Sequence, residues 1–213
     1  MTSAVTVVDY GIGNLKSVCR AFAAAGGNVE LTSDAARLGR AERLVLPGVG
    51  AFGDCVNALR SRGFLEPLRR FFETGRPFLG ICVGMQMMME WGEEFGRHEG
   101  LGLIRGAVRR IPAPAPGGTR YKIPHIGWSE LRRAPATDWS GTILAGTPER
   151  ETAYFVHSFR AEPADKANEV AVCEYYGHSI AAVIRSGPHQ GCQFHPEKSG
   201  AAGLAMIDRF LSQ

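Results

Sequence analysis

The 213-residue chain lacks several features that mark whole classes of proteins. It has no apolar run near the ~20 residues of a membrane-spanning helix, no secretory leader at its start, and no internal repeat or low-complexity segment. Its five cysteines are an odd number and lack disulfide-like spacing. We therefore expect a soluble, reduced, cytoplasmic protein that does not bind a membrane.

An excess of charge of one sign is also missing. The 24 Lys and Arg against 21 Asp and Glu leave a formal net charge of +3. The arginine pairs at 69–70, 109–110 and 132–133 are scattered, which indicates solvated faces rather than a nucleic-acid groove. The length and the 45% hydrophobic content suit one domain over residues 1–213 with a sizeable core. The proline-rich segment 112–118 is expected to be a surface loop, since chemistry-bearing motifs lie on both sides of it.

The chain is organised around segment 77–86, Pro-Phe-Leu-Gly-Ile-Cys-Val-Gly-Met-Gln. The pattern predicts a buried strand, a Gly-x-Cys-x-Gly turn and a helix, which is the form of a nucleophile elbow. Such a turn lifts Cys82 above the sheet at a helix N-terminus, whose dipole favours a thiolate. The amide of Val83 can then face an oxyanion, and Gln86, one turn later, can line the same pocket. An isolated cysteine would favour a structural role, but the elbow favours catalysis.

Short apolar strands alternate with helical stretches through residue 90. The strands are expected at 4–8, 28–32, 44–46 and just before Cys82, and the helices at 15–25, 53–60, 64–73 and after Cys82. This alternation predicts an α/β fold with a doubly wound, mostly parallel sheet. A hairpin over 169–184 and a last strand at 191–194 predict an antiparallel extension of one edge in the second half, before a closing helix at 203–211.

Two glycine-rich turns follow the first and third expected strands. Gly11-x-Gly13 lacks the third glycine of a dinucleotide fingerprint, and Leu15 replaces the required P-loop glycine, so both phosphate-binding interpretations are rejected. Segment 47–52 lets the backbone approach a ligand closely and can offer a second oxyanion amide, from Val49 or Gly50. Taken alone, an ordinary strand-to-helix loop is the simpler interpretation of this segment.

A His-Pro-Glu motif follows the last expected strand. A thiol needs a base, and His195 is the candidate partner of Cys82. Pro196 biases His195 toward extended backbone, which can turn the Glu197 carboxylate back toward the imidazole and orient it. Because the carboxyl ends of parallel strands converge on one crevice, the strand ends that carry Val49, Cys82 and His195 should meet.

Metal chemistry is poorly supported. A zinc site on Cys192 and His195 lacks a second ligand pair. The methionines at 85, 87, 88 and 89 indicate an expected helix that is apolar nearly all round and packs in the core, rather than a sulfur ligand set. We expect neither a metal nor a cofactor.

Segments 80–86, Gly-Ile-Cys-Val-Gly-Met-Gln, and 193–199, Gln-Phe-His-Pro-Glu-Lys-Ser, resemble the triad motifs of class I glutamine amidotransferases. More narrowly, segments 9–15, 47–52, 124–128 and 154–158 are similar to the glutaminase subunits of imidazole glycerol phosphate synthase. The resemblance runs from Val5 to the last helix and implies the flavodoxin-like fold of that family.

The resemblance implies hydrolysis of glutamine to glutamate and ammonia through a Cys82–His195–Glu197 triad and a thioester. His195 would take the thiol proton and later protonate the leaving ammonia, while the amides of Val83 and Val49 would hold the oxyanion. The glutamine would lie against Gly50, Gln86, His157, Ser158 and Phe159.

The resemblance also implies a heterodimer with a separate (β/α)₈-barrel cyclase subunit. The ammonia would pass to this partner and join a phosphorylated ribulosyl-formimino nucleotide, giving imidazole glycerol phosphate and aminoimidazole carboxamide ribotide in histidine biosynthesis. The docking face is expected to include Asn14, Pro124, His125, Trp128 and Lys198. The sequence leaves Trp128 equally open to a core position beside Ile126.

Three departures from the family pattern stand out: Val83 where leucine is common, Phe159 where tyrosine is common, and Ser129 where asparagine is usual. The last two put side-chain hydrogen bonds near the site or the interface in doubt. Three rival functions remain: a glutaminase serving another synthase, such as that for pyridoxal phosphate; a cysteine peptidase or esterase on the same fold; and a non-enzymatic binding module. The first rival is disfavoured by segments 124–128 and 154–158, which match the imidazole glycerol phosphate synthase glutaminases. The second is disfavoured because nothing in the sequence indicates a peptide groove, and the third because the triad residues are intact.

Overall fold

The computed structural model describes residues 3–113, 118, 120–135 and 137–213, so most of the expected loop at 112–118 lies outside the described residues. An eight-stranded sheet forms its centre, in the spatial order β2-β1-β3-β4-β14-β13-β12-β9. Its strands, in chain order, are β1 (Ala4–Val8), β2 (Asn28–Thr32), β3 (Leu44–Gly48), β4 (Phe78–Cys82), β9 (Arg132–Arg133), β12 (Glu169–Tyr175), β13 (His178–Ser186) and β14 (His189–Cys192).

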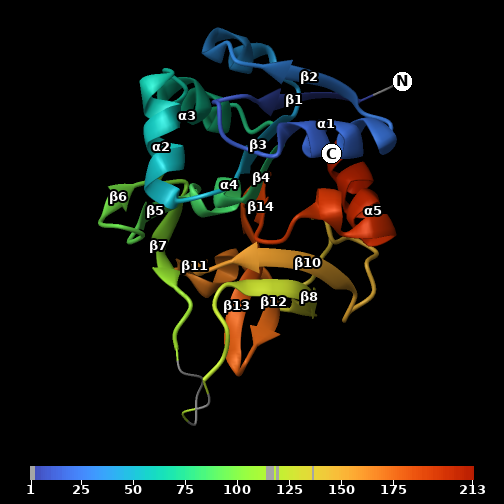
Figure 1. Ribbon diagram of the computed structural model, residues 1–213. Coiled ribbons are helices and arrows are strands. Elements are labelled where there is room, and N and C mark those ends of the chain that lie inside the picture. The colour runs from blue at the N-terminus through green and yellow to red at the C-terminus, as the bar shows by residue number, and fades with distance from the viewer. Residues whose placement is uncertain (1–2, 114–117, 119, 136) are drawn as a thin grey trace.

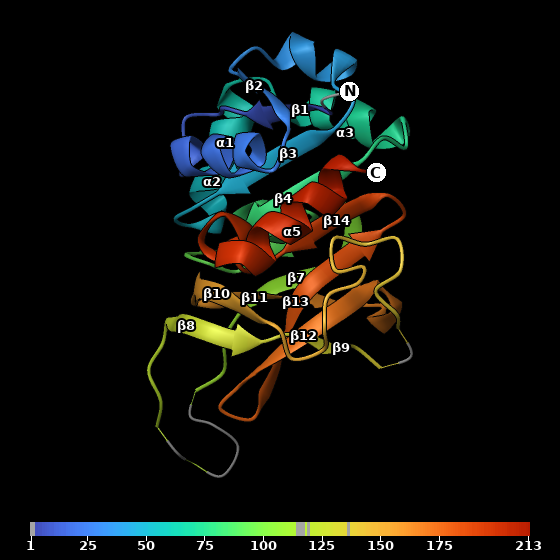
Figure 2. The ribbon, with the colours of Figure 1, turned by 90° about the vertical axis from the view of Figure 1, so that its right-hand side faces the viewer.

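The first half of the sheet is parallel, as the alternating pattern predicts. Strands β2, β1, β3, β4 and β14 all run in one direction. Strands β3 and β4 are buried along their whole length, which requires helices on both faces of the sheet. Figures 1 and 2 show α2 and α3 on one face and α1 and α5 on the other. The helices are α1 (Leu15–Ala24), the 3₁₀ turn η1 (Ala35–Arg40), α2 (Phe52–Ser61), α3 (Leu65–Glu73) and α5 (Gly200–Leu211).

The predicted antiparallel extension is confirmed, but the second half also builds two smaller sheets that the sequence pattern did not indicate. Strands β13, β12 and β9 continue the edge beyond β14 in antiparallel fashion. One small sheet pairs β8 (His125–Glu130) with β10 (Thr152–His157). The other contains β5 (Met89–Gly92), β6 (His98–Glu99), β7 (Ile104–Arg110) and β11 (Phe159–Pro163), and two further 3₁₀ turns are η2 (Lys166–Asn168) and η3 (Pro196–Lys198). No helix in the described ranges is long and apolar enough to cross a membrane.

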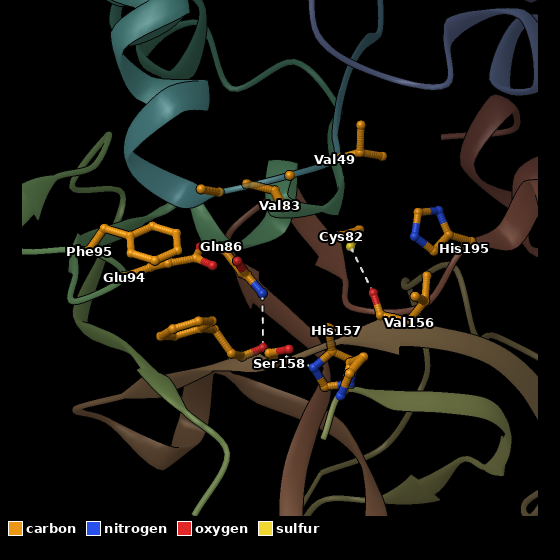
Figure 3. Close-up of a pocket in the computed structure, with 14 residues that line it drawn as sticks. Val49, Cys82, Val83, Gln86, Glu94, Phe95, Val156, His157, Ser158 and His195 are labelled. Atoms are coloured by element: carbon orange, nitrogen blue, oxygen red, sulfur yellow. Dashed lines mark hydrogen bonds between the residues drawn. The ribbon is translucent and has the colours of Figure 1, made fainter. Parts of the chain in front are cut away.

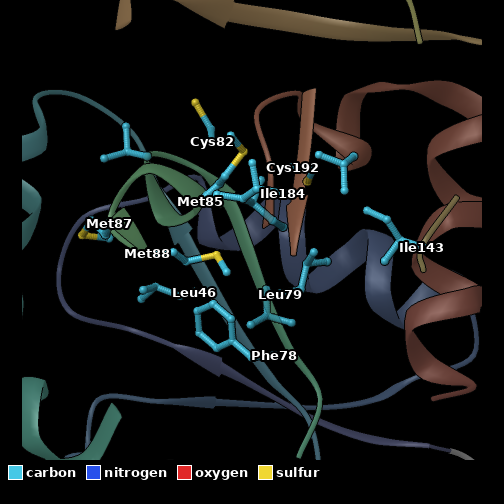
Figure 4. Close-up of a cluster of buried hydrophobic side chains, with 14 of the residues drawn as sticks. Leu46, Phe78, Leu79, Cys82, Met85, Met87, Met88, Ile143, Ile184 and Cys192 are labelled. Carbon is cyan, nitrogen blue, oxygen red and sulfur yellow. The ribbon is translucent and has the colours of Figure 1, made fainter. Parts of the chain in front are cut away.

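The helix expected after Cys82 is much shorter than its apolar sequence suggested. Helix α4 (Val83–Gln86) makes a single turn, and Met89 already begins β5. The chain leaves the helix because the Met87 carbonyl bonds the Leu101 amide at 2.8 Å, starting a second sheet instead of another turn. The four methionines are fully buried, as expected of core residues, although they do not share one helix. Figure 4 shows Met85, Met87 and Met88 in this core. A one-turn helix has only a small dipole, so it contributes little to holding a thiolate at Cys82.

The elbow depends on glycines at its crossing points. Cys82 itself has φ 55°, a left-handed conformation that non-glycine residues rarely adopt. A Cβ atom on Gly84 would overlap the carbonyl oxygen of Leu46, and one on Gly80 would lie 2.6 Å from the carbonyl oxygen of Gly84. The two glycines therefore allow α4 to pack directly on β3 and β4, which holds Cys82 in its strained position.

Candidate active site

A pocket of about 450 Å³ opens where the carboxyl ends of β3, β4 and β14 face β10 and β11. The expected convergence of these strand ends is confirmed. The predicted site residues that line this pocket are Val49, Gly50, Cys82, Val83, Gln86, Pro124, His157, Ser158, Phe159 and His195. Its size lies in the range usual for small-molecule sites.

Cys82 lies at the floor of the pocket with only 4% of its surface exposed. Its Sγ is 4.0 Å from the carbonyl oxygen of Val156 and 3.6 Å from Nε2 of Gln193. The His195 ring lies beside it in Figure 3. The imidazole of His195 is close enough to the sulfur for a hydrogen bond between the two side chains, which is the contact that proton transfer requires.

His195 and Glu197 form a buried pair. The backbone of His195 is extended (φ −101°, ψ 97°), and η3 then turns Glu197 back, as the motif predicts. Nδ1 of His195 lies 2.8 Å from Oε1 of Glu197, which leaves Nε2 of the ring free to serve the pocket. Burial lowers the pKa of His195, but the neighbouring Cys82 sulfur and Glu197 carboxylate together raise it to about 9. The imidazole therefore keeps its proton at neutral pH when a thiolate lies beside it.

The other cysteines differ from Cys82 in their surroundings. Burial raises the pKa of Cys55 to about 11 and that of Cys173 to about 12. It also raises the pKa of the fully buried Cys192 and, to a smaller degree, that of Cys19. These four thiols stay protonated at neutral pH, and none of them lines the pocket in the part of the chain that the structure describes.

Two backbone segments border the pocket on the side of Cys82. Val83 is the first residue of α4, so its amide has no partner within the helix. Val49 follows the end of β3, its carbonyl oxygen accepts a hydrogen bond from Sγ of Cys55 at 3.3 Å, and Gly50 has φ +89°. The assignment of the Val83 and Val49 amides to an oxyanion stays a prediction.

Sequence reasoning missed Gln193, which is fully buried directly beneath the nucleophile. Its Nε2 contacts Sγ of Cys82, and its Oε1 lies 3.0 Å from Nε2 of Gln86. The same Gln86 nitrogen lies 3.0 Å from the carbonyl oxygen of Phe159. The available signal was spacing: Gln193 precedes His195 by two residues, and in the last strand expected at 191–194 this spacing would place both side chains on one face. In the structure β14 ends at Cys192, and Gln193 follows it directly.

Glu94 was also missed. Among the described residues that line the pocket, it supplies the only carboxylate, and its Oε2 accepts a hydrogen bond from the amide of Phe52 at 2.8 Å. Beside it Phe95 is 90% exposed at the pocket mouth. Both residues lie in the turn between β5 and β6, and no motif in the sequence marked this turn as functional.

The prediction that His125 contacts a partner is wrong for this conformation. Its side chain is buried with 1% exposure, since β8 alternates between inward and outward positions. Its Nε2 lies 2.9 Å from Oγ of Ser129, and its Nδ1 lies 3.1 Å from Nε2 of His157. The unusual Ser129 thus keeps a hydrogen bond inside the chain.

The outward positions of β8 carry Ile126 and Trp128, which are 53% and 56% exposed, so a core position for Trp128 is excluded. Trp128 makes an edge contact with Tyr154, with ring centroids 6.0 Å apart, and Nζ of Lys198 lies 5.8 Å from the Tyr154 ring centre. The backbone carbonyl of Tyr154 accepts the His195 amide at 2.9 Å. This exposed aromatic surface therefore adjoins the candidate active site.

Comparison with known proteins gives consistent results. The family model described as glutamine amidotransferase class-I matches residues 6–213. Imidazole glycerol phosphate synthase subunit HisH 1 of Legionella pneumophila (strain Lens) is 50% identical over 210 residues, covering 98% of this chain and 99% of the relative. Subunit HisH of Rhodopirellula baltica is 45% identical over 208 residues, covering 98% and 97%.

Solved structures with much lower identity share the fold. The structure of PurLQS from Thermotoga maritima superposes with a TM-score of 0.74 at 20% identity, covering 100% of this chain and 98% of that one. A second structure from Thermotoga maritima, described as a glutamine amidotransferase, gives a TM-score of 0.62 at 17% identity, covering 92% and 77%. The mixed sheet is therefore the fold of these proteins as well.

Proposed function

The chain belongs to the class I glutamine amidotransferases and, within them, to the HisH subunits, and from this we propose that it is the glutaminase subunit of an imidazole glycerol phosphate synthase. It hydrolyses glutamine to glutamate and ammonia. A cyclase subunit uses the ammonia to form imidazole glycerol phosphate and aminoimidazole carboxamide ribotide in histidine biosynthesis.

The observation that carries this proposal is the convergence of three groups. Cys82 lies on a strained elbow and lines a pocket. His195, whose pKa is raised, lines the same pocket, and the buried carboxylate of Glu197 contacts Nδ1 of its ring. This is the arrangement of nucleophile, base and orienting acid in acyl-transfer enzymes.

In the proposed mechanism, Cys82 attacks the side-chain carboxamide of glutamine as a thiolate. His195, which holds the proton, gives it to the leaving ammonia, and a thioester remains. A water molecule that loses a proton to His195 then cleaves the thioester, which releases glutamate and regenerates the Cys82 thiolate beside a protonated His195. Both tetrahedral states carry charge on an oxygen that the amides of Val83 and Val49 stabilise, and one such donor is commonly worth ~10²–10³ in rate.

The proposed glutamine position uses the walls of the same pocket. Both N–H groups of the Gln86 amide are engaged by Phe159 and Gln193, so Gln86 offers its Oε1 to the substrate. Both nitrogens of His157 are engaged within the chain, so His157 acts as wall rather than as donor. Gly50 and Ser158 complete the walls, and the carboxylate of Glu94 supplies the charge that the α-ammonium group requires.

Replacing Glu94 by glutamine is expected to raise the glutamine KM by about tenfold with little change in kcat, because a charge-assisted contact that exists equally in ground and transition state is lost. Glutamine keeps an oxygen that can accept the Phe52 amide. Steady-state kinetics of the variant check the expectation, and an unchanged KM would remove Glu94 from the substrate site.

The proposed function is tested by glutamine hydrolysis in the presence and absence of a cyclase subunit with its nucleotide. We expect glutamate formation in every case and cyclised product only in the complete mixture. Turnover of a model peptide or ester in preference to glutamine would instead support a peptidase or esterase.

The proposed docking face comprises Ile126, Trp128, Tyr154 and Lys198. The proposal also includes Asn14 and Pro124, and Pro124 lines the pocket. Two exposed apolar side chains next to a cation are typical of an interface centre with a charged rim. The face adjoins the active site, which suits an ammonia-producing subunit, since ammonia released to water would be protonated and lose its nucleophilic electron pair. The partner is a cyclase subunit, and the complex is a heterodimer.

Replacing Trp128 by alanine is expected to weaken the complex by ~2–4 kcal/mol, because tryptophan is a frequent interface hot spot. The melting temperature of the free subunit should change little, since the side chain is 56% exposed. A titration against the cyclase and a melting curve of the free subunit measure the two effects. Unchanged affinity would remove Trp128 from the docking face without affecting the chemistry assigned to Cys82.

A further inference from the structure

The carbonyl oxygen of Phe159 receives hydrogen bonds from two side chains. Nε2 of Gln86 lies 3.0 Å away, and Nδ1 of His157 lies 2.8 Å away. A carbonyl oxygen can only accept, so both nitrogens must carry hydrogen. The Phe159 oxygen therefore determines which atom donates in each hydrogen bond that continues from Gln86 and in each one that continues from His157.

On the histidine side the assignment is unambiguous. A neutral His157 that donates from Nδ1 can only accept at Nε2, so His125 donates from Nδ1 across the 3.1 Å contact. His125 then accepts at Nε2, and Ser129 Oγ donates to it at 2.9 Å. Burial agrees with two neutral rings, because it lowers the pKa of His125 to about 4 and that of His157 to about 3.

On the glutamine side the direction leads to the nucleophile. Gln86 donates its second N–H to Oε1 of Gln193 at 3.0 Å. The amide group of Gln193 is thereby oriented with its nitrogen toward Cys82, where Nε2 lies 3.6 Å from Sγ. A continuous chain of hydrogen bonds thus runs from Ser129, on the strand of the proposed docking face, to the sulfur atom.

We propose that this chain fixes the nucleophile and the pocket wall for the glutaminase reaction, with Gln193 holding the sulfur of Cys82 and His125 acting as a positioning residue for His157, Phe159 and Gln86. The expected effect on glutamine hydrolysis rests on the proposed function. The expected effect of Gln193 on the reactivity of the Cys82 thiol does not. Neither residue belongs to the triad or to the predicted substrate contacts.

The physical reason for the role of His125 is tautomer control. Without its donor, His157 can move its hydrogen to Nε2, and its bare Nδ1 then faces the Phe159 oxygen as one acceptor against another. The carbonyl must turn, and Gln86 loses the partner that directs its oxygen into the pocket. The reason for the role of Gln193 is that an N–H donor stabilises a thiolate more than a thiol, because hydrogen bonds to a charged acceptor are the stronger ones.

Replacing Gln193 by glutamate keeps the acceptor for Gln86 and removes the donor to sulfur. We expect the rate of Cys82 alkylation by iodoacetamide at pH 7 to fall at least about tenfold, and the half-maximal rate to move to higher pH. Gln193→Met, which is uncharged and of similar length, should change the rate in the same direction if the glutamate variant unfolds. Mass spectrometry resolves the labelled sites, and Cys19, which is partly exposed, serves as the internal control with an unchanged rate.

Gln190 provides a matched control. It lies on β14, is 1% exposed, and bonds the Ile143 amide at 2.8 Å and Gln213 at 2.9 Å, away from the pocket. Gln190→Glu should lower the melting temperature about as much as Gln193→Glu and leave the alkylation of Cys82 unchanged. Equal alkylation of Cys82 in the wild type and in both Gln193 variants would overturn the role of Gln193, even where glutamine hydrolysis is demonstrated.

The histidine side is tested by a pair of substitutions at one position. His125→Phe keeps the stacking on Phe155 and Tyr175 but removes the donor, and it should raise the glutamine KM by about tenfold. His125→Asn replaces the Nδ1 donor with an amide nitrogen and should restore KM to near the wild-type value. His189→Phe, at a histidine buried among Phe72 and Phe78 outside the chain of hydrogen bonds, controls for stability. A KM for His125→Phe equal to that of His189→Phe would overturn the role of His125.

Discussion

Replacement of Cys82 by alanine or serine is expected to abolish glutamine hydrolysis, with a loss of ~10⁴-fold or more, while folding and cyclase binding persist. The sulfur is the atom that forms the thioester, and no other thiol lines the described pocket. Serine offers an oxygen whose proton is far harder to remove than that of a thiol, so it should not rescue the reaction. Glutamate release, the melting temperature and a titration against the cyclase measure the three properties.

The remaining cysteines are the controls for this experiment. Cys19→Ser and Cys173→Ala should leave glutamine turnover within a few-fold of the wild type, because neither residue borders the pocket. Wild-type turnover by Cys82→Ala would contradict the mechanism outright. A glutamine-like electrophile should alkylate Cys82 and no other thiol in the native protein.

Replacement of His195 by alanine is expected to be nearly as damaging as the loss of Cys82. His195 accepts a proton from the attacking water and returns one to ammonia, and its raised pKa of about 9 supplies that proton at neutral pH. Glu197→Gln should be milder, since it keeps the shape at the 2.8 Å contact but loses the charge that stabilises imidazolium. Single-turnover and steady-state rates of glutamate release measure both effects.

The double variant tests whether the two residues act together. Groups that act as one unit give effects far from additive, so Cys82→Ala with His195→Ala should be about as inactive as either single variant. A loss equal to the product of the two single losses would show that Cys82 and His195 contribute independently. Both single variants should keep the melting temperature within a few degrees of the wild type if they act on the reaction alone.

The sequence was most informative where a structural constraint acts between residues that are close together in the chain. The elbow at Cys82 could be predicted because the steric constraint lies within five residues, and the glycines at 80 and 84 stand where a Cβ atom would collide with backbone. Similarly, Pro196 restricts the residue before it, so the return of Glu197 toward His195 follows from three consecutive residues. The first parallel strands could be predicted from short apolar runs that alternate with helical stretches, whereas their order in the sheet comes from the structure.

The predictions that failed concern residues whose structure depends on which strand pairs beside them. A run of methionines fits a helix, but pairing between β5 and β7 ends the helix after one turn. His125 and Trp128 are three residues apart, and the pleat of β8 buries one and exposes the other once β10 is paired beside it. The sequence pattern of this strand is compatible with either face being inside.

The amino-acid sequence by itself predicted the elbow at Cys82, the return of Glu197 toward His195 and the parallel half of the sheet, because these follow from short-range sterics and hydrophobic patterning. Only the tertiary structure decided that Gln193 touches the sulfur, that Glu94 enters the pocket, and that one carbonyl oxygen of Phe159 directs hydrogen bonds on both sides. Polar groups separated by tens of residues meet only after the backbone is folded. Their bonds depend on distances of a few tenths of an ångström, which local sequence preferences do not encode.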